Sequence, residues 1–399
     1  MNQKVVIIGH SYTSRLGIIR SLGPYGFELH VVVLAPYNRR SKTILKEKPI
    51  DCYSKFVSKY YICERDEHAL LTLLETQVRD NNQKIVLLPD SDFSAAIVDK
   101  NLERLSQFFI CPNIKGLQGG LIEWMDKNKQ KELASSLGLA IADSTIIHIT
   151  RGKGKIPNNI QYPVFTKPLC SIEGGKIGLC KCDNNQDLEK VIKQFATTTS
   201  TDVLVERYMP IENEYAVVGF SYGGKVYIPA VIEITSLAQG GHFGVAECGR
   251  VLPVGEYLSI IQKFKEFVHA LGFVGLFDID FYKSNGSFYF SEMNMRFGGS
   301  GYAVTKAGVN LPYFYINALI DGKNSEKETY IKHPSAYVNE RMCVDDWYGS
   351  YISLRTYINR LNKSIIHFVK DKEDPKPFRE FNKRFIKLFI KKIVKRIIK

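Results

Sequence analysis

The segment from Asp280 to Arg296 constrains the fold more than any other part of the sequence. It reads DFYKSNGSFYFSEMNMR, and apolar residues flank the polar stretch 284–287 on both sides. This alternation around a polar turn predicts a β-hairpin. Residues two apart on a strand share a face. We therefore expect one face to carry Glu292, Asn294 and Arg296, and the other to carry Ser291, Met293 and Met295.

The polar residues of this hairpin predict a site for a metal and a phosphate. Asp280, Glu292 and Asn294 offer two carboxylates and an amide carbonyl, a hard oxygen set that suits Mg²⁺ or Mn²⁺. Arg296 adds a fork of donors for phosphate oxygens. Asp278 shares the face of Asp280 and offers a further carboxylate. The alternative is a surface hairpin with ordinary charged positions. The apolar frame and the glycines that follow Arg296 argue against it, because glycine lets backbone approach a ligand closely.

This hairpin resembles the metal-binding hairpin of the ATP-grasp superfamily. In that hairpin an acidic residue and a turn precede a second acidic residue followed by M-N-x-R or I-N-x-R. The 12-residue separation of Asp280 and Glu292 equals that in typical members. The resemblance implies ATP and Mg²⁺ (or Mn²⁺) as cofactors, with Asp280, Glu292 and Asn294 as metal ligands. It also implies upstream lysines, a glycine-rich loop and a nucleotide hinge.

Two upstream lysines and a glycine-rich loop match that expectation. Lys127 begins a predicted helix that ends near Gly138, and a predicted strand over 162–168 carries Lys167. The following loop contains Gly174, Gly175 and Gly178. A P-loop is excluded because Lys176 is followed by Ile rather than Ser or Thr. A glycine-rich hairpin that folds over triphosphate fits better, and a plain hairpin turn is the alternative.

The segment 203–209 is an apolar strand that ends in a polar hinge. By the resemblance, Glu206, Tyr208 and Met209 receive the adenine, and Glu214 binds the ribose. Taken alone, Glu206 is equally explained as an exposed residue at a strand end. The ordered set, from Lys127 through Lys167, the loop and the hinge to the hairpin, covers about 200 residues. It implies that Lys127 and Lys167 hold phosphates. Lys167 and Arg296 are then the catalytic side chains, with Arg296 at the transferred group.

The whole chain is expected to combine α/β and α+β architecture. Residues 1–113 alternate strand-like and helix-like segments and resemble a Rossmann-like pre-ATP-grasp domain, although G-x-G-x-x-G is absent. A two-lobed ATP-grasp domain is expected over 114–325, an extension over 326–380 and a helix over 381–399. Asp90–Asp92 follows a predicted strand where open sheets bind ligands, and an N-cap is the alternative. Gly298–Gly301 is expected to wrap a substrate carboxylate, and Tyr302 to close its pocket.

The last predicted helix is basic and amphipathic. Residues 383–399 carry eight Lys or Arg and no acid, so they supply most of the net charge of +13. Such a helix suits an anionic membrane surface. Docking on the body or on a partner subunit is the alternative. Nucleic acid is not expected, because no basic platform with interleaved aromatic residues is present.

We therefore predict an ATP-dependent carboxylate–amine ligase that forms an amide through an acyl phosphate. Its substrates would be a small-molecule carboxylate and an amine, and a cell-envelope or polysaccharide precursor is one candidate. The alternatives are an ATP-grasp carboxylase, a kinase-like relative and a nucleotide-binding scaffold without turnover. Eight cysteines without a C-x-x-C pair suit the cytoplasm, with peripheral contact at the inner membrane face. Homo-oligomerisation and the roles of His242 and Arg250 stay open.

Overall fold

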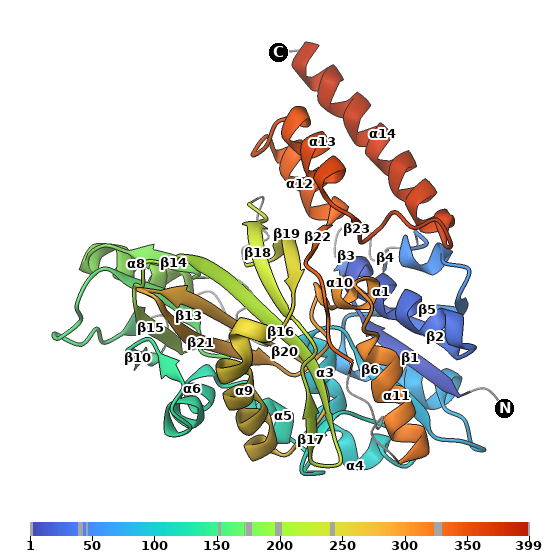
Figure 1. The fold of residues 1–399 in the computed structure, drawn as a ribbon, viewed down its shortest axis with the longest axis horizontal. Coiled ribbons are helices and arrows are strands. Elements are labelled where there is room, and N and C mark those ends of the chain that lie inside the picture. Colours follow the sequence, from blue (N-terminus) through green and yellow to red (C-terminus); the bar gives the residue numbers. More distant parts are fainter. Residues whose placement is uncertain are drawn as a thin grey trace.

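The computed structural model describes residues 3–38, 43–44, 47–150, 153–170, 172, 178–195, 202–239, 244–322 and 329–397. It is a mixed α/β protein in which a small lobe and a parallel-sheet domain flank a large central sheet (Figure 1). The fold class expected from the sequence is confirmed. Within the described part, no helix has the length and apolar character needed to cross a bilayer.

The N-terminal domain contains a parallel sheet in the order β5-β2-β1-β6-β7. Its strands are β1 (Lys4–Gly9), β2 (Glu28–Ala35), β5 (Val57–Glu64), β6 (Ile85–Pro89) and β7 (Phe109–Ile110). Its helices are α1 (Tyr12–Leu22), η1 (Gly23–Tyr25), η2 (Asp51–Tyr53), α2 (Glu67–Leu73), the π-helix η3 (Leu74–Val78), α3 (Asp92–Lys100) and α4 (Leu102–Leu105). A small hairpin pairs β3 (Tyr37–Asn38) with β4 (Thr43–Ile44). Buried apolar runs such as Val5–Ile8 suit a parallel sheet covered on both faces.

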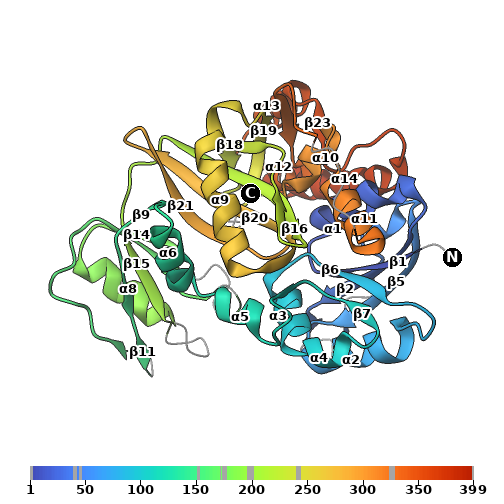
Figure 2. The same cartoon turned by 60° about the horizontal axis from the view of Figure 1, so that its bottom comes forward.

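The small lobe lies at the far side of the molecule from the N-terminal domain (Figure 2). Its antiparallel sheet runs β10-β15-β13-β14. The strands are β10 (Ser144–Ile147), β13 (Val164–Pro168), β14 (Cys180–Cys182) and β15 (Val203–Arg207), with β11 (Ile149–Thr150) and β12 (Lys153–Gly154) forming a separate ribbon. Helix α8 (Asn185–Phe195) closes a separate apolar core through Leu188, Val191, Ile192 and Phe195.

The central sheet runs β23-β22-β19-β18-β16-β20-β21-β9, with β17 and β8 as side branches. Its strands are β8 (Asn113–Ile114), β9 (Ala140–Ile141), β16 (Asn213–Tyr222), β17 (Lys225–Tyr227), β18 (Val231–Leu237), β19 (Ala246–Leu252), β20 (Phe273–Ser284), β21 (Ser287–Asn294), β22 (Ser335–Val338) and β23 (Ile366–His367). The helices around it are α5 (Gly120–Trp124), α6 (Lys127–Ser136), η4 (Gly255–Tyr257), α9 (Leu258–Leu271), α10 (Gly301–Lys306) and α11 (Leu311–Asp321).

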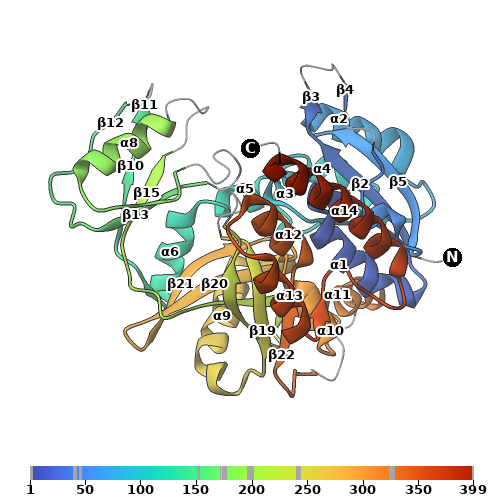
Figure 3. The same cartoon turned by 90° about the horizontal axis from the view of Figure 1, so that it is seen from above.

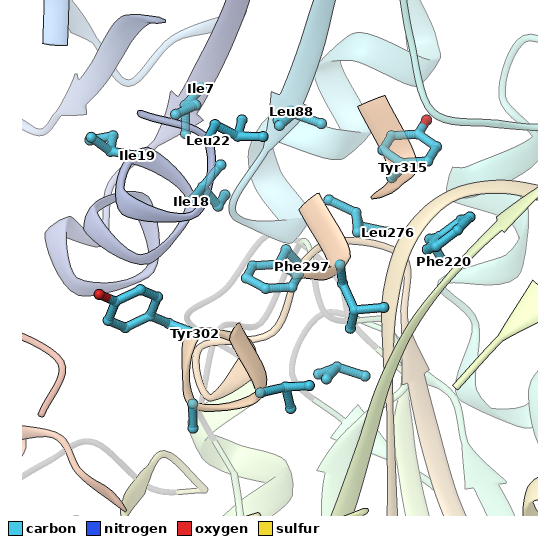
Figure 4. Packing of buried hydrophobic residues seen from close by; sticks show 14 of the residues in the cluster. Ile7, Ile18, Ile19, Leu22, Leu88, Phe220, Leu276, Phe297, Tyr302 and Tyr315 are labelled. Atoms are coloured by element: carbon cyan, nitrogen blue, oxygen red, sulfur yellow. The ribbon is translucent and has the colours of Figure 1, made fainter. Parts of the chain in front are cut away.

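The N-terminal domain and the central sheet share one hydrophobic core. Ile7, Ile18 and Leu88 come from the first domain, whereas Leu276 and Phe297 come from the central part, and all five pack in the same cluster (Figure 4). The cluster's aromatic and aliphatic side chains are almost fully buried. Apolar burial on this scale makes the two parts one packed body.

The C-terminal part packs back against the N-terminal domain (Figure 3). It contains α12 (Glu340–Gly349), α13 (Leu354–Lys363) and α14 (Pro375–Ile397). Buried Arg20 of α1 donates to Asp374 Oδ2 at 3.1 Å and to the carbonyls of Phe368 and Val369 at 3.0 Å each. These bonds fix the chain that leads into α14, which begins at Pro375 rather than at residue 381.

Helix α14 has two apolar sides with different surroundings. Phe385 and Phe389 contact Trp347 of α12, with ring centroids 5.3 and 5.6 Å from the Trp347 ring. In contrast, Ile386 and Ile390 are 55% and 56% exposed. Docking, the alternative reading of the sequence, therefore describes the phenylalanine side of the helix. The isoleucine side has no such cover in the described part.

The predicted hairpin is confirmed with its turn. β20 and β21 pair antiparallel from Asp278↔Asn294 to Ser284↔Ser287. Asn285 and Gly286 have φ values of 48° and 74°, the left-handed pair that a tight hairpin turn requires. The strict alternation predicted for Ser291 is wrong. The register shifts between Asp280↔Glu292 and Phe281↔Phe290, so Ser291 is the extra residue of a bulge.

Candidate active site

The hairpin brings its acidic residues together as cross-strand pairs. Asp280 lies opposite Glu292, and Asp278 lies opposite Asn294. The Asn294 amide donates to Asp280 Oδ2 at 3.2 Å. The expected metal ligands Asp280, Glu292 and Asn294 therefore gather at one place. Asp278 joins them, as its shared face with Asp280 predicted.

These carboxylates lie close enough to oppose each other's ionisation. Burial, together with the charges of Asp278 and Glu292, raises the pKa of Asp280 well above its usual range. Burial raises the pKa of Asp278 to about 6 even though Arg296 acts in the opposite direction. Neighbouring carboxylates in a dry site hold protons more tightly, and a bound cation reverses that effect. The pair Asp278 and Asp280 is therefore electrostatically suited to a cation.

Glu292 differs from the two aspartates because lysines surround it. Lys127 Nζ lies 3.2 Å from Glu292 Oε2. Burial alone would raise the pKa of Glu292, but Lys127 and Lys167 outweigh it and keep the pKa below its usual value. Lys127 is the first residue of α6 and is itself only 6% exposed. This ion pair links the predicted phosphate-binding helix to the predicted metal strand.

A glutamine on α6 fixes the position of that helix against β21. The Gln130 side chain accepts from Met293 N at 2.7 Å and donates to Met293 O at 3.0 Å. It therefore pairs with the strand as another strand would. Gln130 was absent from our predictions. Its partner is 163 residues away in sequence, and only its place one turn after Lys127 in the helix pointed to it.

A second ion-pair network joins Lys167, Glu206 and Lys131. Lys167 Nζ lies 2.8 Å from Glu206 Oε2 and Lys131 Nζ lies 2.8 Å from Glu206 Oε1. Burial alone would raise the pKa of Glu206, but the two lysines lower it to about 2. Lys167 also donates to Ser291 Oγ at 3.2 Å. Glu206 therefore orients Lys167, a role that the sequence reading did not assign to it.

Lys131 is a site residue that sequence reasoning missed. Its ammonium also donates to Ala142 O at 2.7 Å, and burial lowers its pKa despite Glu206. Lys131 lies four residues after Lys127, so the two occupy one side of α6. That spacing was the available sequence signal.

The glycine-rich loop is described only at its end. Gly174 and Gly175 lie outside the described residues. Gly178 has φ of 74°, and a Cβ there would meet Phe195 Cε2 at 2.0 Å. The close helix and the left-handed backbone both require glycine at this position. Gly178 is thus needed for packing of the small lobe, and its contact with phosphate stays a prediction.

The segment that follows the hinge borders a cavity. Tyr208 is 39% exposed, and its ring faces the ammonium of Lys181 at 4.9 Å. Glu214 on β16 lines a cavity of about 990 Å³ together with Ile211, Ser236 and Tyr351. Burial raises the pKa of Glu214, and Lys167 counteracts that rise. Of the expected adenine and ribose contacts, Glu214 lines this cavity and Glu206 pairs with Lys167, while the roles of Tyr208 and Met209 stay predictions.

Arg296 joins the hairpin to the N-terminal domain. Its Nε donates to Asp92 Oδ1 at 3.0 Å, and its Nη2 donates to Asn294 Oδ1 at 3.2 Å. Its Nη1 lies 3.5 Å from Asp278 Oδ2. The acidic neighbours raise the pKa of Arg296 although burial acts against them. Asp92 begins α3 behind an N-cap by Ser91, so the N-cap reading of the 90–92 segment is confirmed, and ligand binding there stays a prediction.

Three other sequence candidates behave differently. Arg250 is engaged by Glu233, with Nε donating to Oε2 at 2.6 Å, and its side chain is 52% exposed. His242 lies outside the described residues. The expectation that Tyr302 closes the substrate pocket is wrong. Tyr302 is buried in the shared core, and its hydroxyl donates to Asp371 Oδ2 at 3.2 Å, because α10 packs onto α1.

The residues present fit a divalent cation by their chemistry. Asp278 Oδ1 is buried, and no hydrogen-bond donor reaches it in the described part of the chain. An uncompensated buried oxygen beside two further carboxylates is costly unless a cation joins them. Among the described residues, no group of three or more His, Cys, Asp or Glu side chains has the arrangement of a metal cage. The ligand set of two carboxylates and an amide therefore stays a prediction.

Comparisons with known proteins find an ATP-binding domain in the part of the chain that carries these residues. The family model "Carbamoyl-phosphate synthase L chain, ATP binding domain" matches residues 126–320. D-aspartate ligase of Enterococcus faecium is 21% identical over 304 residues, which cover 70% of each chain. The carbamoyl phosphate synthase large chain of Hyperthermus butylicus is 26% identical over 50% of this chain, and the match covers 19% of that longer protein.

The fold agrees with solved structures as well. The L-amino acid ligase of Bacillus licheniformis superimposes with a TM-score of 0.61 at 17% identity, covering 84% of this chain and 79% of that one. The matched region 126–320 contains every site residue predicted from the hairpin, hinge and lysines. The proteins that this chain is similar to include a D-aspartate ligase and an L-amino acid ligase. The chain belongs to the ATP-grasp superfamily.

Proposed function

We propose that this ligase phosphorylates a substrate carboxylate with ATP and then joins the acyl group to an amine. One observation carries the proposal. Lys127, Lys167 and Arg296 all approach the acidic hairpin, each paired with a carboxylate. Such a set holds cations beside a row of acids in a partly dry site, as phosphoryl transfer requires.

The nucleotide is proposed to lie between the hinge and the hairpin. Lys127 and Lys167 would exchange their carboxylate partners for phosphate oxygens, and Gly174, Gly175 and Gly178 would cover the phosphates. Glu206, Tyr208, Met209 and Glu214 would hold the adenosine. Lys131 keeps Glu206 charged and in place, because the glutamate accepts from both lysines at 2.8 Å.

The metal site is proposed at Asp280, Glu292 and Asn294. A bound Mg²⁺ or Mn²⁺ would neutralise charge on the phosphates. The chain's own groups do the remaining work. Asp278 orients Arg296, whereas Asn294 bridges Arg296 and Asp280 through its carbonyl and amide.

The chemistry follows from the poor reactivity of a free carboxylate. A carboxylate oxygen attacks the γ-phosphorus of ATP, the bond from that phosphorus to the β–γ bridging oxygen breaks, and ADP leaves. The amine then attacks the acyl carbon, phosphate leaves with the bonding pair, and the amine loses a proton. Arg296 donates to the transferred phosphoryl group, while Lys167 holds the nucleotide phosphates during the transfer.

The substrates are proposed to be a small-molecule carboxylate and an amine, with at least one of them an amino acid. Relatives named for D-aspartate and L-amino acid ligation support this class. A cell-envelope or polysaccharide precursor is one acceptor of this kind. We also propose the division into a first domain (1–113), an ATP-grasp domain (114–325), an extension (326–380) and a basic terminal segment (381–399), which continues the helix that begins at Pro375.

Substrate-dependent release of ADP tests the proposed activity. A panel of amino acids and sugar acids, each offered with a panel of amines, is expected to contain a pair that stimulates ADP release in the presence of Mg²⁺. Hydroxylamine should intercept the acyl phosphate as a hydroxamate. A kinase-like enzyme would release ADP without a hydroxamate, a carboxylase would require bicarbonate, and a scaffold would release no ADP with any pair.

A separate proposal concerns where the enzyme works. The exposed side of α14 presents Ile386, Ile390, Ile393 and Val394, between 42% and 56% exposed, on a helix rich in lysine and arginine. We propose that this side contacts an anionic membrane surface, because each basic residue near such a surface contributes about 1 kcal/mol. The protein would then be peripheral on the inner face of the cytoplasmic membrane.

Pelleting with liposomes tests the membrane proposal. Full-length protein should pellet with phosphatidylserine-containing vesicles and stay in solution with neutral ones. A double variant, Ile386→Ser with Ile390→Ser, should lose pelleting while keeping its melting temperature, because both side chains are exposed. Equal pelleting by wild type and variant would refute the proposal.

A further inference from the structure

The carboxyl edge of the N-terminal sheet collects basic side chains beside Arg296. His10 follows β1, and Arg65 follows β5. Arg341 comes from α12 of the C-terminal part. We call His10, Arg65, Arg296 and Arg341 the arginine bay. Ligands of open α/β sheets bind at this edge of the strands. Under the proposed function, the bay is therefore where the first domain would face the transferred phosphoryl group.

Two aromatic rings direct the outer arginines over this edge. The Arg65 guanidinium lies 4.8 Å from the ring centroid of Phe93, which is on α3 after β6. Its side chain thus points from the edge strand β5 toward the strands at the middle of the sheet. The Arg341 guanidinium lies 4.9 Å from the ring of Tyr12, two residues after His10. Stacking holds both guanidinium groups without neutralising them.

The charges of the bay are compensated unequally. Arg296 has close acidic partners in Asp92 and Asp278. Among the described residues, the one carboxylate within ion-pair distance of Arg341 is Asp345 at 3.6 Å, on its own helix. In the described part of the chain, no carboxylate lies within ion-pair distance of Arg65. A positive potential therefore remains at the outer side of the bay, away from the hairpin.

The pKa of His10 is lowered by burial and by the positive charges around it. Burial lowers its pKa to about 4, and Arg65, Arg15, Arg296 and Arg341 each add to that effect. Arg15 is largely neutralised, since its Nε donates to Asp51 Oδ2 at 2.7 Å. His10 is consequently a neutral hydrogen-bonding group at physiological pH, placed among the other three arginines.

We propose that the carboxylate substrate carries a second anionic group, and that this group binds His10, Arg65 and Arg341 while Arg296 faces the carboxylate that is phosphorylated. The inference rests on the proposed ligase function and names its substrate class. A substrate with two anionic groups on a short carbon chain would place one group at Arg296 and the other at His10, Arg65 and Arg341. The second group is a carboxylate or a phosphate, since guanidinium forks bind both.

Calorimetric binding of small anions to the full chain, with ADP and Mg²⁺ present, tests the proposal. Succinate and butyrate have the same number of carbons and differ by one carboxylate. We expect succinate to bind at least tenfold more tightly than butyrate. Phosphoglycolate, which replaces the second carboxylate by phosphate, distinguishes the two sources of charge. Equal affinities for succinate, phosphoglycolate and butyrate, or no binding of any of them, would overturn the proposal.

Matched arginine variants locate the effect. Arg65→Gln and Arg341→Gln should each weaken the binding of the preferred dianion at least tenfold and leave butyrate unchanged. Arg79→Gln is the control, because Arg79 stacks on Phe108 at 5.1 Å at the opposite edge of the same sheet. Its dianion affinity should stay within twofold of wild type. Equal losses in Arg65→Gln and Arg79→Gln would contradict the assignment.

A nuclear magnetic resonance signal provides a readout that turnover does not affect. With labelled histidine, the His10 ring signal, assigned with His10→Gln, should shift on addition of the preferred dianion and not on addition of butyrate. This shift and the calorimetric difference can hold even if no amine yields ADP, in which case only the proposed ligase function fails. Productive ligation of monocarboxylates without preference for dianions would instead reject the bay and keep the ligase.

Discussion

The nucleotide side and the first-domain side of this active site differ in the partners of their basic side chains. On the nucleotide side, Lys127 and Lys131 of α6 and Lys167 of β13 each lie within 3.2 Å of a carboxylate oxygen. In the arginine bay, Arg65 and Arg341 rest mainly on aromatic rings. The paired side is held together by its own ion pairs, and under the proposed function its lysines would exchange these partners for phosphates. In the arginine bay, the guanidinium groups of Arg65 and Arg341 remain available to bind an anionic substrate. This side is therefore suited to substrate selection.

The largest expected effect comes from breaking the paired side at Glu292. Glu292→Ala leaves Lys127 without its carboxylate and removes a proposed metal ligand, so we expect kcat/KM for ligation to fall about 1,000-fold. Steady-state ADP release measures this. Ser291→Ala, which removes only a hydroxyl bonded to Lys167, should cost less than about tenfold. Full activity in Glu292→Ala would refute the metal assignment.

The second prediction concerns how the stability that ionised Glu206 contributes depends on pH. The folded pKa is about 2 against an ordinary 4.5. A lowered folded pKa contributes stability above the unfolded pKa, and that contribution disappears as pH falls from about 4.5 to about 2. Two and a half units correspond to about 3 kcal/mol of unfolding free energy. Glu206→Gln should lack this contribution.

Urea unfolding of wild type and Glu206→Gln at several pH values checks this prediction. The stability difference between the two proteins should be largest near pH 7 and shrink steadily below pH 4.5. Other titrating groups, such as Asp278 and Asp280, are common to both proteins and largely cancel in the difference. A difference that is independent of pH would show that Lys131 and Lys167 do not hold Glu206 ionised.

Asp92→Asn tests the junction between the two sides. The variant removes the charged anchor that orients Arg296, and we expect kcat to fall about tenfold or more while the KM for ATP changes less than threefold. Steady-state kinetics separate the two constants. Asp80→Asn is the control, because Asp80 pairs with Lys4 at the far edge of the same sheet and should change neither constant. A rise in the KM for ATP alone would place Arg296 on the nucleotide rather than at the acyl phosphate.

The smallest expected effect concerns a charged pair outside both sides. Arg250→Gln should change kcat/KM less than about threefold, because the guanidinium is half exposed and committed to Glu233. The same ADP-release assay measures it. A loss of tenfold or more would extend the substrate site to β19 and would weaken the distinction between paired and unpaired regions.

Local patterns predicted the parts of the site that lie on one segment. The alternation of β20 and β21, the turn at Asn285–Gly286 and the start of α6 at Lys127 are all properties of short stretches, and the structure confirms them. The bulge at Ser291 was missed because one inserted residue reverses the alternation that the prediction assumed. A register shift leaves no mark in composition.

Contacts between distant segments were beyond the sequence patterns. Gln130 on Met293, Lys131 on Glu206 and Asp92 on Arg296 each join residues 75 to 204 positions apart. Each depends on how whole elements pack, and a single chain without comparison partners carries no signal of that packing. Tyr302 illustrates the same limit, since its position suggested the pocket and its packing put it in the core.

The core shared by the N-terminal domain and the central sheet restricts how this enzyme can acquire new substrates. Separating the chain near residue 113 would expose Ile18, Leu88 and Phe297 to water on two different fragments. Exchange of the first domain for that of another ligase would meet the same mismatch. Retargeting, in the laboratory or in evolution, is therefore expected to proceed through replacement of individual side chains at the strand ends, with the domain itself retained.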